Sequence, residues 1–371
     1  MLPRSPLHLV LTALLISMSG ACTSLYKGPE FVERVDRIDQ DQLEEIIVAL
    51  EKIGPRATAD SAATERTATW IRGQLEGYGY TVIEEEFDAP TGARTPVVLV
   101  RKKDSGPDGE TLEIPLGSRS SKELESEGWK TSGSYLKPVT VKALNLFAEI
   151  PGSELADEVI EVNAHYDTVS GSPGASDNSS GVAIVLEMAR VLAGGAPSRT
   201  IRFCFFAAEE SGLDGSRAHV ERILQPDTPE VVALINLDSV GFYSEEPDSQ
   251  KAPVRIPLVT WLPSTGNFIA VIGTFSTGWL GNIFEASADA YVPQLKYYSA
   301  NRIGGFFKDA LRSDHAPYWD AGIPALFLTD TANFRSKTYH RPEDTSEKMN
   351  FLFVSRVAQA ATATVLELST L

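Results

Sequence analysis

The chain has 371 residues, of which 43% are hydrophobic and 22% are charged, and its formal net charge is −17. This composition is typical of a globular protein with one or two sizeable cores and excludes general disorder. The acidic balance also excludes nucleic acid as a partner, because phosphate binding needs a surface rich in Lys and Arg.

The N-terminal residues have the pattern of an export signal. An arginine precedes the apolar run 7–18, which is too short to span a bilayer stably. The small residues 19–21 directly before Cys22 resemble a bacterial lipoprotein processing site, although this pattern usually has Leu where Ser19 stands. Lipidation of Cys22 would tether the protein to a membrane face, and the alternative is an ordinary cleaved signal. We therefore expect a signal peptide over 1–22, a linker over 23–40, and an exported protein that is periplasmic or anchored in a bacterial envelope.

The elements that follow the linker are two helices and two strands. Apolar residues at helical spacing predict helices over 41–53 and 60–77. Residues 80–87 and 96–103 are strand-like, and the stretch 103–137, rich in Gly, Ser, Lys and Glu, is predicted as an inserted and partly exposed loop region. We expect one domain over 41–371 that carries this insert.

From residue 141 onward, apolar strands alternate with helical segments. The predicted strands are 141–150, 158–165, 201–208, 231–238, 268–273 and 324–328. The predicted helices are 181–193, 214–224, 282–291 and 351–368. Such alternation predicts an α/β fold, a three-layer sandwich with a mostly parallel central sheet flanked by helices. In sheets of this kind, ligands bind beyond the carboxyl ends of the strands.

Ionisable side chains stand where these strands end. They are His165, the pair Glu209 and Glu210, and Asp238, to which the loops add Asp177 and His340. Imidazole and carboxylate ligands suit Zn²⁺, and their number exceeds what one catalytic zinc takes, so the set indicates two metal ions. Each residue also has an ordinary alternative: His165 as a hydrogen-bonded structural residue, Asp177 as a turn former and Asp238 as a cap. The adjacent pair of glutamates is harder to explain without a cation, because two like charges at a strand end repel each other.

The order of the motifs adds a family resemblance. The segments "HYDTV", "GASDNSSG", "FFAAEESGLDGS", "INLDSVGF", "RSDHAPYWDAGIPALFLTD" and "YHRPEDT" follow one another between residues 165 and 345. In this order and spacing they resemble the motifs of the M28 family of zinc aminopeptidases, from about residue 141 to the C-terminus. Residues 41–87 resemble the first helices and strand of the same fold, whereas 103–137 match nothing in it.

The resemblance implies a function and roles for single residues. It implies an aminopeptidase with two Zn²⁺ per chain, in which His165 and Asp238 hold one ion, Glu210 and His340 hold the other, and Asp177 bridges both. Glu209 then stands where the family has its general base, taking a proton from a water that the ions share. It also implies a cis peptide at Asp177–Asn178, an orienting role for Asp167 toward His165, and a supporting or substrate-side role for His315, for which helix-start structure is the alternative.

Two other readings of the same fold stay open. A glutaminyl cyclase-like acyltransferase would use one zinc, and the presence of both His165 and Asp238 speaks against it. An inactive binding homologue would keep the fold without catalysis, and the intact set of ligand-type residues with Glu209 speaks against it. The expected partner is a peptide with a free N-terminus, with membrane contact only through the N-terminal lipid, and the oligomeric state is left open. We expect His219 on a helix surface, without a role in the site.

Overall fold

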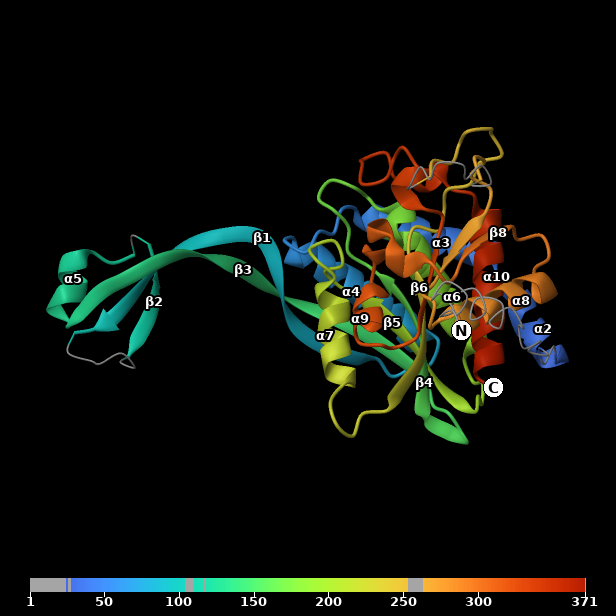
Figure 1. Ribbon diagram of the computed structural model, residues 1–371, viewed down its shortest axis with the longest axis horizontal. Helices are drawn as coiled ribbons and strands as arrows, with labels where there is room; N and C mark the ends of the chain where they lie inside the picture. Colours follow the sequence, from blue (N-terminus) through green and yellow to red (C-terminus); the bar gives the residue numbers. More distant parts are fainter. Residues whose placement is uncertain (1–24, 26–27, 104–109, 117, 253–262, 371) are drawn as a thin grey trace, which may run out of the picture.

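The computed structural model of the chain describes residues 25, 28–103, 110–116, 118–252 and 263–370. The predicted signal peptide 1–22 and the predicted lipidation site Cys22 lie outside the described residues. The described part forms a central sheet covered on both faces by helices, with a long two-stranded projection at one side (Figure 1).

Within the described residues, the sheet has nine strands in the order β2-β1-β3-β5-β4-β6-β9-β7-β8. Their bounds are β1 Ile83–Lys102, β2 Thr111–Pro115, β3 Trp129–Ile150, β4 Leu155–His165, β5 Arg199–Phe206, β6 Glu230–Leu237, β7 Ile269–Ile272, β8 Tyr297–Ala300 and β9 Ala325–Thr329. The four central strands β5, β4, β6 and β9 pair in parallel, and antiparallel pairing joins β3 to β5 and β7 to β9. The predicted three-layer α/β class is confirmed, with the parallel pairing concentrated at the centre of the sheet.

Helices of two unequal layers enclose this sheet. The larger layer contains α2 Pro29–Asp36, α3 Gln40–Ile53, α4 Ser61–Gly77, α6 Ser180–Leu192, α8 Gly278–Tyr291 and α10 Phe351–Leu368. The smaller layer contains α7 Asp214–Ile223 and α9 Ala316–Asp320. Successive residues of β5 alternate between the two cores: Phe203 and Phe205 pack toward the larger layer, and Cys204 and Phe206 toward the smaller one. Because both faces are covered, the central strands read as continuous apolar runs.

Helix α10 is long and apolar enough to cross a membrane, judged by length and composition only. It is 78% buried within the fold, where it packs against α2, α3, α6 and α8. Its apolar character is that of a core helix.

The segment 23–40, predicted as a linker, contains the helix α2. The side chains of Phe31 and Val35 are buried in the main core, and Arg34 donates a hydrogen bond to the carbonyl of Val191. The prediction was wrong because an eight-residue helix among charged residues has too short an apolar stripe to stand out in the sequence.

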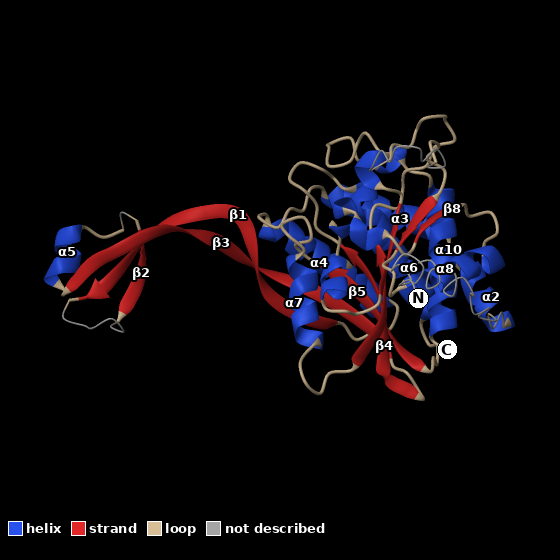
Figure 2. Ribbon diagram, viewed as in Figure 1, coloured by secondary structure: helices blue, strands red, loops and turns tan. Residues whose placement is uncertain are grey.

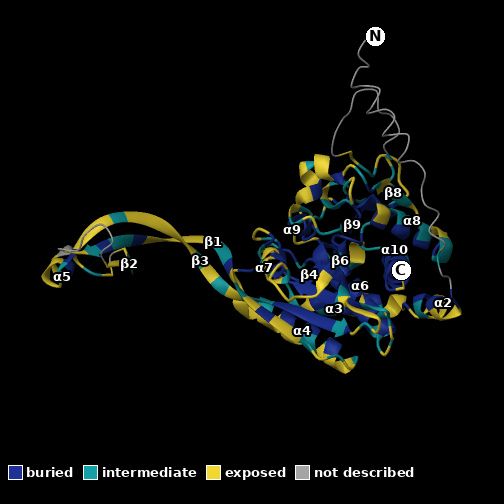
Figure 3. Ribbon diagram, turned by 60° about the horizontal axis from the view of Figure 1, so that its bottom comes forward, coloured by how far each residue is buried: buried dark blue, intermediate teal, exposed yellow. Residues whose placement is uncertain are grey.

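The described residues of 103–137, predicted as a loop region, belong to an ordered arm. Strands β1, 20 residues long, and β3, 22 residues long, pair with each other from the main sheet out to the tip (Figures 1 and 2). There β2 pairs with the edge of β1, and α5 Ser121–Ser126 packs against β3. The two strands predicted over 80–87 and 96–103 are one continuous strand. A ribbon exposed on both faces lacks the apolar alternation by which strands are recognised, so its sequence resembles a loop (Figure 3).

Candidate metal centre

The first half of the candidate site forms where β4, β5 and β6 end. His165 is the last residue of β4, Asp238 follows β6, and Glu209 lies in the turn after β5. The His165 Nε2 atom lies 3.7 Å from Asp238 Oδ1 and 4.0 Å from Glu209 Oε2, and all three residues are buried. Parallel neighbours present their carboxyl ends at one edge of the sheet, which is why residues 73 positions apart along the chain meet here.

Asp177 connects this half to a second group. Its Oδ1 atom lies 3.3 Å from His165 Nε2, and its Oδ2 atom lies 3.0 Å from His340 Nε2. The same His340 Nε2 atom is 3.1 Å from Glu210 Oε2. The peptide bond Asp177–Asn178 is cis, as the family resemblance implies. The structure therefore brings together all six residues that the sequence singled out as ligands and base.

Asp167 supports both groups. Its carboxylate accepts hydrogen bonds from the backbone N–H groups of Glu209 at 3.1 Å and Glu210 at 3.2 Å. Its backbone carbonyl lies 3.2 Å from His165 Nδ1, which leaves Nε2 of that ring directed at the carboxylates. A buried residue that orients an imidazole and the neighbouring turn is typical of the surroundings of protein metal ligands.

Two residues that the sequence analysis missed hold the turns of the site. The side chain of Asn145, on β3, accepts from the N–H of Ala207 at 3.1 Å and donates to the carbonyl of Gly215 at 2.9 Å, so it ties together both ends of the turn with the two glutamates. The Asp344 carboxylate accepts from the backbone N–H groups of Ser176 and Asp177. Asp344 stands inside the motif "YHRPEDT", which was a usable signal, whereas nothing in the sequence around Asn145 points to such a contact.

His315 lies beside the site and contacts neither ligand group. Its ring donates from Nε2 to the carbonyl of Ala310 at 2.6 Å, accepts at Nδ1 from Asn236, and stacks on Phe327. Burial lowers the pKa of His315 to about 3, so the ring is neutral at physiological pH. It supports the wall beside the metal centre.

His219 corrects a prediction, because it is buried and not on a helix surface. Its ring is 3.0 Å from Glu161 Oε1 and 3.4 Å from Glu85 Oε2, between α7 and the strands β1 and β4. Burial alone would lower the pKa of His219, but the two carboxylates raise it to about 9. The apolar partners Phe147 and Phe206 pack against the same ring, and only the fold places these groups around it.

The electrostatics of the site favour a bound cation. Burial raises the pKa of Glu209 well above its usual range, and the carboxylates of Asp238 and Glu210 add to this although His165 opposes it. Burial and the Asp177 carboxylate likewise raise the pKa of Glu210 to about 7. Carboxylates crowded in this way repel one another unless a positive charge lies between them.

The polar atoms also fit divalent metal ions. Within the described residues, His165 Nε2, His340 Nε2 and Glu210 Oε1 are buried and make no hydrogen bond of good geometry, although Asp177 oxygens lie 3.3 and 3.0 Å from the two imidazole nitrogens. They belong to two groups of ligand atoms, one formed by His165, Glu209 and Asp238 and the other by Asp177, Glu210 and His340, in each of which all ligand atoms lie within 4.8 Å of one another. Nitrogen and carboxylate oxygen are the ligands that zinc takes in catalytic sites.

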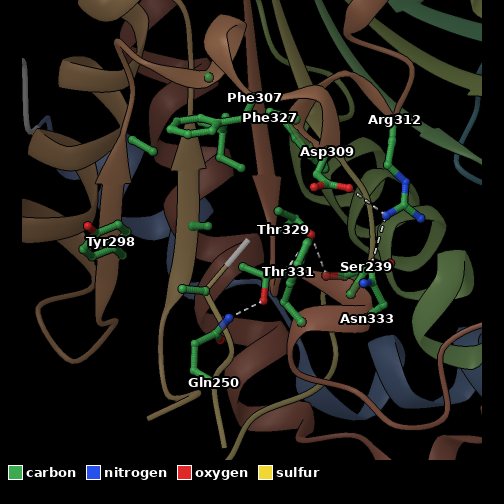
Figure 4. A pocket seen from close by; sticks show the side chains of 18 of the residues that line it. Ser239, Gln250, Tyr298, Phe307, Asp309, Arg312, Phe327, Thr329, Thr331 and Asn333 are labelled. Atoms are coloured by element: carbon green, nitrogen blue, oxygen red, sulfur yellow. Dashed lines mark hydrogen bonds and ion pairs between the residues drawn. The ribbon is translucent and has the colours of Figure 1, made fainter. Parts of the chain in front are cut away.

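A cavity of about 290 Å³ opens beside the metal centre. Asp238 and Tyr339 are among the residues that line it, and its walls are mostly apolar, with Phe268 among them. Phe307 and Phe327 of these walls are seen in Figure 4. Arg312, another lining residue, contacts Asp309, Asn333 and the hydroxyl of Tyr339. The cavity can take an apolar group of a ligand while the polar end of that ligand meets the metal-site residues.

The fold and the site define the class of the protein, an α/β protein of the zinc-aminopeptidase fold. A solved structure of the zinc aminopeptidase BSAP from Bacillus subtilis matches it with a TM-score of 0.63 and 21% identity, over 89% of this chain and 95% of that chain. A glutaminyl cyclase from Bacteroides thetaiotaomicron matches with a TM-score of 0.57 and 17% identity, over 89% of this chain and 98% of that chain. These likenesses show the fold.

Sequence comparison gives the family. Residues 145–365 match the model of peptidase family M28, and the chain belongs to that family. It is 36% identical over 214 residues to the uncharacterized protein YfbL of Escherichia coli, a match that spans 54% of this chain and 64% of YfbL. It is 30% identical over 219 residues to the aminopeptidase YwaD of Bacillus subtilis, a match that spans 57% of this chain and 41% of YwaD. The chain thus spans less than two thirds of the length of these relatives.

Proposed function

We propose that the protein is a zinc-dependent aminopeptidase with two Zn²⁺ per chain that removes the N-terminal residue of peptides. One observation carries the proposal: the two oxygens of Asp177 face two different imidazole Nε2 atoms, at 3.3 and 3.0 Å. A buried carboxylate placed in this way is arranged to bridge two cations. His165 and Asp238 would hold one ion, Glu210 and His340 the other, and Asp177 both.

The residues of the chain divide the remaining work. Zinc bound there supplies Lewis acidity, which lowers the pKa of a coordinated water and polarises a carbonyl. Glu209 is buried next to the ligands, 4.0 Å from His165 Nε2, a place that suits a carboxylate that takes a proton from the attacking water and passes it to the leaving amine. Carboxylates of the cleft that the zinc ions do not neutralise attract the free α-ammonium group of the substrate. The apolar cavity receives the side chain of the substrate's N-terminal residue. We therefore expect a preference for apolar N-terminal residues.

The fold likeness to a glutaminyl cyclase favours a second candidate, intramolecular acyl transfer at one zinc. Against it stands the first ligand group, since His165 and Asp238 are retained, buried and 3.7 Å apart, as a second metal requires. An inactive binding homologue would not need Glu209 and the five ligands together.

The test is a screen of aminoacyl chromogenic substrates, dipeptides and peptides with N-terminal Gln, before and after chelation and with zinc added back. Two zinc ions per chain, hydrolysis from the N-terminus and loss of turnover on chelation are the expected results. One zinc at full activity together with cyclisation of N-terminal Gln would establish the acyltransferase instead. Absence of turnover on every substrate with zinc bound would leave a binding protein.

We also propose that the protein is exported and anchored in a bacterial envelope through a lipid on Cys22. The support is the apolar run 7–18, followed by small residues and a cysteine. Radiolabelled palmitate should enter the full-length protein in a bacterial host and not its Cys22→Ser variant. Equal labelling of both proteins would remove the anchor from the proposal.

A further inference from the structure

Arg56 is a completely buried arginine outside the segment that matches the family model. It lies between α3 and α4, in a stretch to which neither the motifs nor the family match assign a role. Burying a guanidinium is costly unless hydrogen bonds and nearby negative charge compensate it. The groups that contact the Arg56 guanidinium therefore indicate its role.

Every hydrogen bond that Arg56 donates through its side chain beyond its own turn goes to one loop of the metal centre. Its Nε atom donates to the carbonyl of Tyr166 at 2.5 Å, Nη1 to the carbonyl of Pro173 at 2.7 Å, and Nη2 to the hydroxyl of Ser179 at 2.7 Å. Its backbone N–H donates to Thr168 Oγ1 at 3.0 Å. The guanidinium thus joins the beginning, middle and end of the loop 166–179.

This loop carries two residues of the site. Asp167, near its start, receives the N–H groups of the two glutamates, and Asp177, near its end, lies between the two imidazoles. The loop is rich in Gly, Ser and Pro and has no strand or helix along most of its length. The shape of the loop is therefore set by contacts with other segments of the chain. The hydrogen bonds that Arg56 donates to it, at 2.5 to 2.7 Å, are among the shortest of these.

The charge of Arg56 matches the same site. Within the described residues, no carboxylate is in ion-pair contact with Arg56, but Asp167, Asp177 and Asp344 surround it at longer range and favour its charged form. Burial lowers the pKa of Arg56 to about 10, so it is still protonated at neutral pH. The planar fork that reaches three acceptors at once is specific to arginine, because a lysine ammonium is a point charge.

We propose that Arg56 is a positioning residue of the metal centre: its guanidinium holds the loop 166–179 in the shape that places Asp167 and Asp177 against His165. The inference rests on the metal centre of the proposed function and not on the peptidase activity.

The variant Arg56→Lys keeps the positive charge and removes the fork. We expect the zinc affinity, measured by competition with a chromogenic chelator, to fall about 10- to 100-fold. At saturating zinc, kcat should fall by a similar factor while KM changes little, because the base and the bridging carboxylate are displaced and the substrate cavity is not. Hydrogen exchange of the amides in 166–179 should become faster.

Arg335→Lys is the matched control. Arg335 is also a buried arginine, and its guanidinium donates to Phe242 O, Phe268 O and Gln250 Oε1, all outside the loop 166–179. Its burial lowers the pKa of Arg335 to about 10, as for Arg56. The control should lose thermal stability to a similar extent and keep its zinc affinity.

Three results would overturn the proposal. The first is that Arg56→Lys keeps both the zinc affinity of the wild type and its rate of hydrogen exchange in 166–179. The second is an equal loss of zinc affinity in Arg335→Lys, and the third is an unchanged zinc affinity in the milder variant Ser179→Ala. The last variant is used if Arg56→Lys does not fold; it removes only the hydroxyl that accepts from Arg56 and donates to the Gly174 carbonyl. If the wild-type protein binds two zinc ions and hydrolyses no peptide, the proposed function fails while these binding and exchange tests still decide the role of Arg56.

Discussion

At the residue scale, Glu209 and Glu210 are neighbours with different surroundings. Glu210 Oε2 lies 3.1 Å from His340 Nε2, within the group that Asp177 completes. Glu209 is 4.0 Å from His165 Nε2, the longest contact of that imidazole with a carboxylate. The backbone N–H groups of both bind the same Asp167 carboxylate, so one turn directs two identical side chains to different places.

This difference predicts opposite effects of two substitutions. Glu209→Gln should keep both zinc ions and lose about 10²- to 10⁴-fold in kcat, because the proton acceptor is gone and the ligands remain. Asp177→Ala should lose zinc as well, because the bridging carboxylate is removed. Zinc content by mass spectrometry and kcat on the best aminoacyl substrate check both. Equal zinc loss in the two variants would make Glu209 a ligand.

At the element scale, the turn after β5 is held by how closely its two ends approach. An added Cβ at Gly215 would lie 2.2 Å from the Ala207 carbonyl oxygen and 2.6 Å from Asn145 Oδ1. These groups are backbone and a buried side chain, so they cannot move aside cheaply. The glycine therefore permits the contact by which Asn145 closes the turn.

Gly215→Ala should accordingly lower zinc affinity and kcat about 10-fold or more, because it pushes apart the ends of the turn that carries Glu209 and Glu210. Chelator competition and steady-state kinetics measure the two effects. Gly73→Ala is the control: a Cβ there meets nothing within 4 Å, inside helix α4, and it should leave both quantities unchanged while favouring the helix. Similar losses in the two variants would contradict the role of the turn.

The arm is a second element with its own small core. Val100, Leu124 and Trp129 form a cluster at its tip, and no described residue between 90 and 140 belongs to either large core of the body. Its ribbon is mostly exposed on both faces (Figure 3). The body should therefore fold without it.

Replacing residues 90–140 by Asn-Gly tests this, because Ala89 and Val141 are paired across the two strands and a two-residue turn can join them. We expect the shortened protein to keep its zinc content and to unfold within a few degrees of the full-length body in thermal scans. Loss of zinc or insolubility would mean that the arm stabilises the body.

At the scale of the whole molecule, a buried charge network crosses the smaller helical layer. His219 lies between Glu161 and Glu85, and Arg202 Nη1 is 2.7 Å from Glu161 Oε1. The hydroxyl of Tyr318 donates to the other oxygen of Glu161 at 2.6 Å. The network joins the root of the arm, the central sheet, α7 and α9, so its charge state affects the stability of the whole fold.

The raised pKa of His219, about 9 against an unfolded value of about 6.5, gives this network a pH dependence. The protonated ring stabilises the folded state, so its contribution is fully present below about pH 6.5 and is lost as the pH rises through about 9. The expected size is on the order of 3 kcal/mol. Urea unfolding of the wild type and His219→Gln across this range, at equal zinc, should show a smaller decline in the variant. Parallel curves would contradict the assignment.

The sequence by itself determined the fold class and indicated the residues that meet at the candidate metal centre. Buried parallel strands read as apolar runs, and the ionisable residues that end them must meet at one edge of the sheet, so His165, Glu209 and Asp238 were identifiable from periodicity alone. The loops added Asp177 and His340, and the order of the motifs implied a role for each residue. Both kinds of signal are local along the chain.

Only the tertiary structure decided what holds these residues in place. Arg56, Asn145 and His219 act through hydrogen bonds to segments that are between 58 and 134 positions away, and no local pattern marks such a partner. The strands of the arm were not recognised in the sequence because a ribbon exposed to water on both faces lacks a periodic pattern of apolar residues. A buried polar contact is specified by the fold around it, whereas a buried apolar strand is visible in its own sequence.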